Sequence, residues 1–379
     1  MTLYPHESVN LFFGPNGSGK TNLLEAVHYC ALGKSHRTAS DQNVIQSGEK
    51  EALCRVSVRG RAARQEISIH LSQQEAQRKT IQIDQKRVAR FSELMGCLQC
   101  VIFSPEDLGL IREGPSLRRR YLDMMISQMN RGYFVALQQY RAGMEQRNAI
   151  LKNLRINPGA DRRMLDAFEN AMAQSAEVIT AERLRILQLL APLAEETYRG
   201  ISGREEEQFQ LSYHSGLKDE DHPAEALSAQ LRENREEDIR TGLTSAGPHR
   251  DDLQLTLNRK IMKLFASQGQ IRTAALCLKL AQMKALRQLT GESPVLLLDD
   301  VMSELDRTRR TRLLSEILDF QTFITCTDPS DLEDDRSRRE YSVISRDGLG
   351  QMELMTAGRE EEKPILSEPD FGTEADCFT

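Results

Sequence analysis

The feature that most constrains this chain is a glycine-rich segment close to its beginning. Residues 14–21 read Gly-Pro-Asn-Gly-Ser-Gly-Lys-Thr and match the pattern Gly-x-x-x-x-Gly-Lys-Ser/Thr at every position. A short apolar run at 8–13 precedes the segment, and apolar residues at helical spacing follow it in 21–32. A strand before this pattern and a helix after it form the setting in which the pattern binds phosphate. An ordinary surface turn is the alternative, and this setting disfavours it.

Each residue type in the segment has a physical reason to be there. Glycines let backbone N–H groups turn inward around an anion, because side chains at those positions would block the approach. We expect Lys20 to reach the β- and γ-phosphates and Thr21 to offer its hydroxyl to Mg²⁺. The helix that follows directs its positive end at the phosphates. The predicted cofactors are therefore ATP and Mg²⁺, and the predicted contacts are Gly14, Pro15, Asn16, Gly17, Ser18, Gly19, Lys20 and Thr21.

A second element suited to this chemistry lies far along the chain. Residues 294–300 form an apolar run that ends in Asp299 and Asp300, which predicts a buried strand with two carboxylates at its end. P-loop enzymes hold their metal with a carboxylate at a strand end, and we predict this role for Asp299. Asp300 could polarise a water molecule for attack on the γ-phosphate. The alternative is a buried strand followed by a solvated acidic turn.

The rest of the chain alternates between strand and helix patterns, which predicts an α/β fold. Period-two alternation in three short segments predicts an antiparallel sheet next to the phosphate loop. From about residue 116 to 200, apolar residues recur at helical spacing with a break at 157–159, which predicts an inserted helical hairpin or bundle. The expected strands are 52–59, 65–71, 80–83, a segment near 209, 252–257 and 320–325, and a long helix is expected at 272–289.

The net charge of −6 hides an uneven distribution of charge. Residues 1–165 carry 24 Lys and Arg against 15 Asp and Glu, whereas the remainder carries 26 against 41, so a polyanion could meet the first part. We find no run of eighteen apolar residues and no signal-peptide pattern, so we expect a cytoplasmic location. Seven scattered cysteines, Cys97 and Cys100 among them, are expected as reduced thiols rather than a zinc site or disulfides.

Six sequence blocks together resemble one family. The chain is similar to the RecF family of recombination mediators, whose ABC-type ATPase heads are related to SMC proteins and Rad50. The blocks are NLFFGPNGSGKTNLLEAVHYCALGKSHRT at 10–38, FSPEDL at 103–108, RRRYLD at 118–123, AGPHRDD at 246–252, SQGQIRTAALCLKLA at 267–281 and LLLDDVMSELD at 296–306. The phosphate loop alone indicates a superfamily, and the six blocks in this order indicate the family.

The resemblance implies an ABC-type P-loop head with an antiparallel β-subdomain and an inserted α-helical lid. It implies an N-terminal head part at 1–115, a helical insertion at 116–241, a C-terminal head part at 242–356 and an acidic disordered tail at 357–379. Asp300 would take the place of the catalytic carboxylate, one bond shorter than the usual glutamate. A D-loop at 303–306 would cross a dimer interface. Ser267, Gln268, Gly269 and Gln270 look like the signature loop that contacts the γ-phosphate bound by the other protomer.

Three departures from the family pattern bear on this expectation. Members usually carry a strand and an Arg-containing segment before the position of Ser8, which are missing here, so we expect weaker adenine binding. Ile271 replaces the second glutamine of the usual signature Ser-x-Gly-Gln-Gln-Arg-Thr. Cys326 and Thr327 stand where transporter ATPases carry a switch histidine. We infer slow turnover.

The resemblance also implies DNA as a partner, with roles in DNA damage repair, replication and the SOS response. It implies an ATP-dependent homodimer that clamps gapped DNA or duplex/single-strand junctions and, with RecR and RecO, helps to load RecA. Candidate contacts to the DNA backbone are Lys34, Arg37, Arg118, Arg119 and Arg120. A solvated helix face is the alternative for the three arginines. His249 and Arg250 suit either turn scaffolding or phosphate sensing. The alternative functions are a transporter ATPase subunit and a nucleotide-binding protein with no DNA role or without real turnover.

Overall fold

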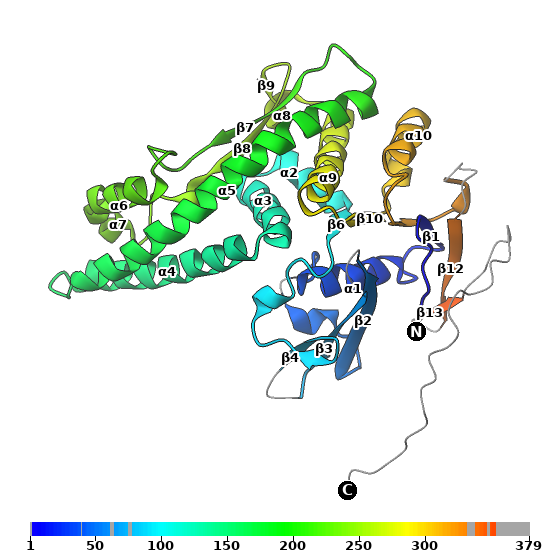
Figure 1. Ribbon diagram of the computed structural model, residues 1–379, viewed down its shortest axis with the longest axis horizontal. Coiled ribbons are helices and arrows are strands. Elements are labelled where there is room, and N and C mark those ends of the chain that lie inside the picture. Colours follow the sequence, from blue (N-terminus) through cyan, green and yellow to red (C-terminus); the bar gives the residue numbers. More distant parts are fainter. Residues whose placement is uncertain are drawn as a thin grey trace, which may run out of the picture.

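The computed structural model describes residues 2–38, 40–60, 64–74, 78–331, 338–346 and 349–353. The acidic tail predicted at 357–379 lies outside the described residues. Figure 1 shows three regions: a central sheet with its helices, a small antiparallel sheet beside α1, and a long helical hairpin on the other side. No helix in the described part of the chain is both long and apolar enough to cross a bilayer.

The central sheet has the strand order β13-β12-β1-β11-β10-β6. Its strands are parallel except for the pair β12 and β13. They are β1 (Val9–Phe13), β6 (Cys100–Phe103), β10 (Val295–Asp299), β11 (Thr322–Cys326), β12 (Arg338–Arg346) and β13 (Leu349–Glu353). The carboxyl ends of β1, β10 and β11 meet at one edge of the sheet, because parallel strands in register end on the same side.

Both faces of this sheet are covered, and successive side chains on a strand point into different cores. Leu11 packs with residues of α9 (Gln268–Thr290), whereas the neighbouring Phe12 packs with residues of α1 (Lys20–Leu32). Leu296 and Leu298 share the first core and Leu297 belongs to the second. A run of apolar residues without alternation is therefore what a strand between two cores requires.

The small antiparallel sheet has the order β2-β3-β4-β5. The three strands predicted from alternation are confirmed, each beginning one residue earlier than expected. The strands are β2 (Glu51–Arg59), β3 (Arg64–Ser72), β4 (Lys79–Ile83) and β5 (Lys86–Arg87). The two-residue β5 was not predicted, because so short a strand carries no alternation. Ile67 and Ile69 of β3 pack in the same core as α1, which attaches this sheet to the phosphate-loop helix.

The helical region is built around two long antiparallel helices. Figure 1 shows α4 and α5 running side by side away from the central sheet. They are separated at 157–162, where the sequence predicted a break. The helices of this region are α3 (Pro115–Met129), α4 (Arg131–Ile156), α5 (Arg163–Ser202), α6 (Pro223–Glu233) and α7 (Arg235–Thr241), and the short α2 (Gly109–Arg112) precedes them.

A third sheet interrupts this helical region. Strand β7 (Phe209–His214) pairs with β8 (Asp252–Leu257), and β8 pairs with β9 (Lys260–Ile261). Because β7 falls inside 116–241, that range is helical only in part. The short α8 (Met262–Phe265) leads from β9 to α9, and α10 (Arg307–Glu316) follows β10.

Two buried arginines connect the helices of the hairpin region. Arg147 on α4 is fully buried and forms ion pairs with Glu169 on α5 at 3.0 Å and Asp238 on α7 at 2.7 Å. Arg183 on α5 pairs with Asp123 on α3 at 2.7 Å and with Asp251. Buried charges need such partners, because leaving one unpaired costs several kcal/mol, about 3–5 in measured cases. Apolar periodicity does not reveal these pairs, and the sequence did not predict them.

Candidate functional site

The phosphate loop connects the buried strand β1 to α1, which begins at Lys20. Gly19 is the N-cap residue of α1, with φ 100° in the left-handed region that favours glycine, and no side chain caps the helix. A Cβ atom at Gly19 would meet nothing within 4 Å, so the space in front of the helix is open. The uncapped N–H groups of the first turn thus face a space that an anion can enter.

Gly14 is required for a different reason. A Cβ atom there would lie 2.3 Å from the backbone oxygen of Val343 on the neighbouring strand β12, and its φ of 150° is one that other residues rarely adopt. We predict that Gly14→Ala lowers the free energy of unfolding by about 1–3 kcal/mol. Gly159→Ala is the matched control, since a Cβ at Gly159 meets nothing within 4 Å, and it should change stability by less than about 1 kcal/mol. Urea unfolding measures both, and equal stability would contradict the close approach.

One polar group of the loop lacks a partner that a phosphate would supply, and a second is held at the loop by backbone oxygens. The Ser18 hydroxyl is buried and has no hydrogen-bond partner among the described residues. The Lys20 ammonium donates to the backbone oxygens of Gly14 at 2.7 Å and Pro15 at 2.8 Å. Burial lowers the pKa of Lys20, although nearby Asp300 and Asp299 act in the opposite direction. An unpaired buried donor is costly, so these residues fit a bound phosphate group.

The structure brings Thr21 and Asp299 together, although 278 positions separate them in the sequence. The Thr21 hydroxyl donates to Asp299 Oδ1 at 2.9 Å, and the Thr325 hydroxyl on β11 donates to the same oxygen at 2.8 Å. Hydroxyl and carboxylate oxygens are the ligands that Mg²⁺ prefers, so this pair fits the predicted metal. Sequence reasoning missed Thr325: it lies inside a predicted strand, but its contact depends on the pairing of β10 with β11.

Asp300 follows Asp299 at the mouth of the site. Its φ of 52° lies in the left-handed region, a strained conformation for a non-glycine residue that is often found at functional positions. Burial and the nearby Asp299 raise the pKa of Asp300, and a hydrogen bond from Ser303 acts in the opposite direction. A carboxylate with a raised pKa accepts a proton more readily, which suits a general base.

The candidate signature residues occupy the first turn of α9 rather than a loop before it. The helix begins at Gln268, four residues earlier than predicted, because Ser267 and Gln270 form a capping box. The Gln270 side chain also donates to Glu207 at 2.9 Å. Figure 1 shows α8, which immediately precedes this turn, well away from α1. The signature residues therefore do not face the phosphate loop of their own chain.

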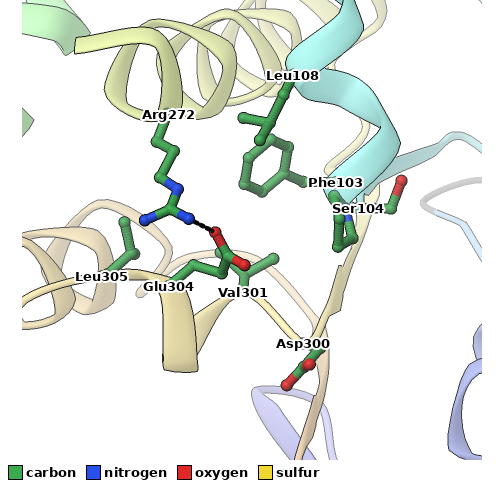
Figure 2. A pocket seen from close by; sticks show the side chains of 9 residues that line it. Phe103, Ser104, Leu108, Arg272, Asp300, Val301, Glu304 and Leu305 are labelled. Atoms are coloured by element: carbon green, nitrogen blue, oxygen red, sulfur yellow. Dashed lines mark ion pairs between the residues drawn. The ribbon is translucent and has the colours of Figure 1, made fainter. Parts of the chain in front are cut away.

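The N-terminal part of α9 contacts the segment that follows Asp300. Arg272 of α9 forms an ion pair with Glu304 at 2.6 Å, within the predicted D-loop. Figure 2 shows this pair above Asp300, in a cleft that Phe103 and Leu108 also line. The ion pair thus connects α9, two residues after the predicted signature residues, to the predicted D-loop.

The five candidate DNA contacts differ in their surroundings. Lys34 is exposed, and Arg37 lies beside the first turn of α1, where it donates to Asn22 at 3.2 Å. Arg118 is buried and donates to both carboxylate oxygens of Asp252, at 2.7 and 2.9 Å, so it connects two sequence blocks. We therefore leave Arg118 out of the contacts proposed below.

Arg119, Arg120 and His249 line a cavity described below, and His249 has a scaffolding geometry. One ring nitrogen contacts the Tyr140 hydroxyl at 2.7 Å and the other contacts the Thr244 backbone oxygen at 3.1 Å. Burial lowers the pKa of His249 to about 4, so the ring is neutral at physiological pH. Both ring nitrogens are engaged, which favours the scaffolding role over phosphate sensing.

Comparisons with known proteins show which family the chain resembles. A family model described as the RecF/RecN/SMC N-terminal domain matches residues 1–347. The DNA replication and repair protein RecF of Clostridium perfringens is 40% identical over 341 residues, covering 89% of this chain and 92% of that protein. RecF of Ruminiclostridium cellulolyticum is 39% identical over 322 residues, covering 84% and 86%.

Solved structures of related proteins have the same fold. A structure described as recombination mediator protein RecF-ATP in the RecFOR pathway has 33% identity and a TM-score of 0.82, covering 93% of this chain and 94% of that one. The Smc head domain of Pyrococcus furiosus, at 15% identity and a TM-score of 0.53, shares the fold. Fold and site thus define an α/β ABC-type ATPase head, as predicted. Within that class, the chain belongs to the RecF family.

Proposed function

We propose that the chain is an ATP-dependent DNA clamp of recombinational repair and replication-gap processing. The observation that carries this proposal is the bond between Thr21 and Asp299, which joins the phosphate loop to the carboxylate edge of the sheet. Family membership supports it, since the related RecF structure is described with ATP. A nucleotide-binding ABC-type protein with no DNA role, or without real turnover, is the alternative.

In this proposal the residues of the loop bind and orient the triphosphate. The backbone N–H groups before Lys20 and the Lys20 ammonium contact the phosphates, while Thr21 and Asp299 hold the metal. Mg²⁺, when bound, offsets negative charge on the β- and γ-phosphates. Asp300 accepts the proton of the attacking water, at the mouth of the site. The Ser303 hydroxyl donates to the Asp300 carboxylate at 3.3 Å, which orients this carboxylate.

The signature residues support a site shared between two copies. Because Ser267 to Gln270 do not face their own phosphate loop, we propose that they contact the γ-phosphate bound by a second chain. The 23-residue helix α9 directs the positive end of its dipole from this turn, which suits an anion. ATP would then hold two heads together, and hydrolysis would release them. Enzymatic activity in this scheme is weak and DNA-stimulated.

The DNA role rests on the basic residues and on the family. We propose backbone contacts by Lys34, Arg37, Arg119 and Arg120, and partnership with RecO and RecR in loading RecA. We also propose that 1–115 and 242–356 act as one head, with 116–241 as the lid between them. Such a function would be carried out in the cytoplasm, on gapped DNA.

Retention on gapped duplex DNA tests this proposal. With ATP the protein should remain on labelled gapped DNA after a challenge with competitor, and with ADP it should leave. Gapped DNA should also raise the rate of phosphate release. Phosphate release without ATP-dependent retention would favour the alternative with no DNA role, and ATP binding without any release would favour the alternative without turnover. Equal retention with ATP and with ADP would contradict the clamp.

A further inference from the structure

A cavity of about 220 Å³ lies outside the nucleotide site, where α3, α4 and α5 meet the turn at Pro248–Arg250. Four guanidinium groups line it, those of Arg119, Arg120, Arg141 and Arg183, against one carboxylate, that of Asp123. The cavity is much larger than a single water molecule needs. Its lining also includes Tyr140 and His249, which are bonded to each other.

The positive charges of this cavity are not all matched. Asp123 accepts from Arg183 at 2.7 Å and from Arg141 at 3.0 Å, and Arg183 also pairs with Asp251. Arg119 donates only to a backbone oxygen, that of Asp251 at 2.6 Å. Arg120 is exposed and forms no hydrogen bond or ion pair with any described residue. Two guanidinium groups on successive positions of α3 therefore lack a carboxylate partner in the cavity.

An anion would relieve this arrangement. Burial and repulsion from Arg183 lower the pKa of Arg119, although nearby Asp251, Asp252 and Asp123 act in the opposite direction. A phosphate suits the geometry better than a planar carboxylate, because its tetrahedral oxygens accept from donors that converge from two helices, here Arg119 and Arg120 on α3 and Arg141 on α4. The ring of Tyr140 is only 2% exposed and packs near the ring of His249, so it offers no open face on which a base could stack. The cavity would recognise phosphate without reading sequence.

From this geometry we infer that the cavity binds a phosphate group of a single DNA strand, through Arg119, Arg120 and Arg141. A strand that can turn inward reaches a cavity, whereas the regular backbone of a duplex runs past its mouth. The inference rests on the proposed DNA-binding function and deepens it. It places the contact in a hollow of the helical region that is open to solvent at Arg120 and Arg141, apart from the phosphate loop.

Binding of a labelled single-stranded oligonucleotide without nucleotide tests the inference. Arg120→Glu should weaken binding about tenfold, as expected for a lost charged hydrogen bond. The slope of log affinity against log salt should also fall by about 0.7 for the lost contact. Arg232→Glu is the matched control, since Arg232 is exposed on α6, outside the cavity. This substitution changes the net charge by the same amount as Arg120→Glu. Because Arg120 is also exposed and unpaired among the described residues, both variants should keep the wild-type unfolding midpoint.

Equal oligonucleotide affinity in the two variants would overturn the inference. If the ligand is instead a free phosphate compound, wild-type protein should bind pyrophosphate with saturating ADP present. Arg120→Glu should then abolish pyrophosphate binding and leave oligonucleotide affinity unchanged. If the ligand is instead an acidic protein, Arg120→Glu should lose binding to polyglutamate and keep its affinity for the oligonucleotide. Either result rejects a DNA strand as the ligand. The wild-type protein could show no ATP-dependent retention on gapped DNA while Arg120→Glu still weakens oligonucleotide binding without nucleotide. In that case the proposed clamp function is wrong and the phosphate site in the cavity is supported.

Discussion

Replacing Lys20 with alanine is expected to abolish ATP-dependent retention on DNA. The ammonium group lies at the loop, where it donates to two backbone oxygens and stands near Asp299 and Asp300. Without it, the β- and γ-phosphates lose a charged hydrogen-bond donor, worth about 1.5–3 kcal/mol. ATP affinity should then fall roughly tenfold to a hundredfold. Equilibrium binding of a fluorescent ATP analogue and the DNA challenge assay measure the two effects.

The control for this prediction is Lys152→Ala, which removes an exposed lysine of α4 far from the loop along the chain. It should leave ATP affinity and DNA retention unchanged. Nucleotide-free binding of DNA should survive in Lys20→Ala, because that binding depends on basic residues elsewhere. Unchanged retention in Lys20→Ala at high salt would show that nucleotide does not drive the clamp.

Asp300→Asn should separate binding from turnover. The amide has nearly the same shape but cannot take a proton, so phosphate release should fall by about 10²–10⁴-fold, as for loss of a general base. ATP binding should persist, since Lys20, Thr21 and Asp299 are intact. Retention on gapped DNA should last longer, because hydrolysis no longer releases the clamp. Single-turnover phosphate release and the dissociation rate from DNA measure these effects.

Asp300→Glu is the informative companion variant. It keeps the carboxylate and extends its reach by one bond, to the residue usual in ABC-type heads, so turnover should be retained or increased. Wild-type turnover in Asp300→Asn would mean that another group takes the proton. If Asp300→Glu turns ATP over more slowly than the wild type, the short side chain of Asp300 and its strained backbone set the position of the base.

The approach of the phosphate loop to the paired aspartates could be predicted because both are local patterns. The phosphate loop and the paired aspartates each follow an apolar run, and parallel strands bring such ends to one edge without further information. Thr21 and Asp299 are therefore in contact as expected. The beginning of α9 was placed four residues late, because its first turn is polar and only the capping box of Ser267 and Gln270 shows where the helix starts.

What the sequence could not supply are contacts between distant elements. Thr325 meets Asp299 only through the register of two neighbouring strands, and Arg118 meets Asp252 across 134 positions. Three successive arginines look alike in the sequence, but the helix turns them to different surroundings. Arg118 is buried in an ion pair, whereas Arg119 and Arg120 line a cavity, Arg119 half-buried and Arg120 exposed. Distinguishing them requires the packing of α3 against β8.

Mixing two defective variants tests the central claim most directly: that one chain's phosphate loop and a second chain's signature turn enclose the same ATP. Lys20→Ala removes the first part, and Ser267→Arg blocks the second. Each variant alone should sediment as a monomer with ATP. An equimolar mixture should form a dimer, because the Ser267→Arg loop and the Lys20→Ala signature turn make one intact site. A mixture that stays monomeric, while wild-type protein dimerises with ATP, would contradict the shared site.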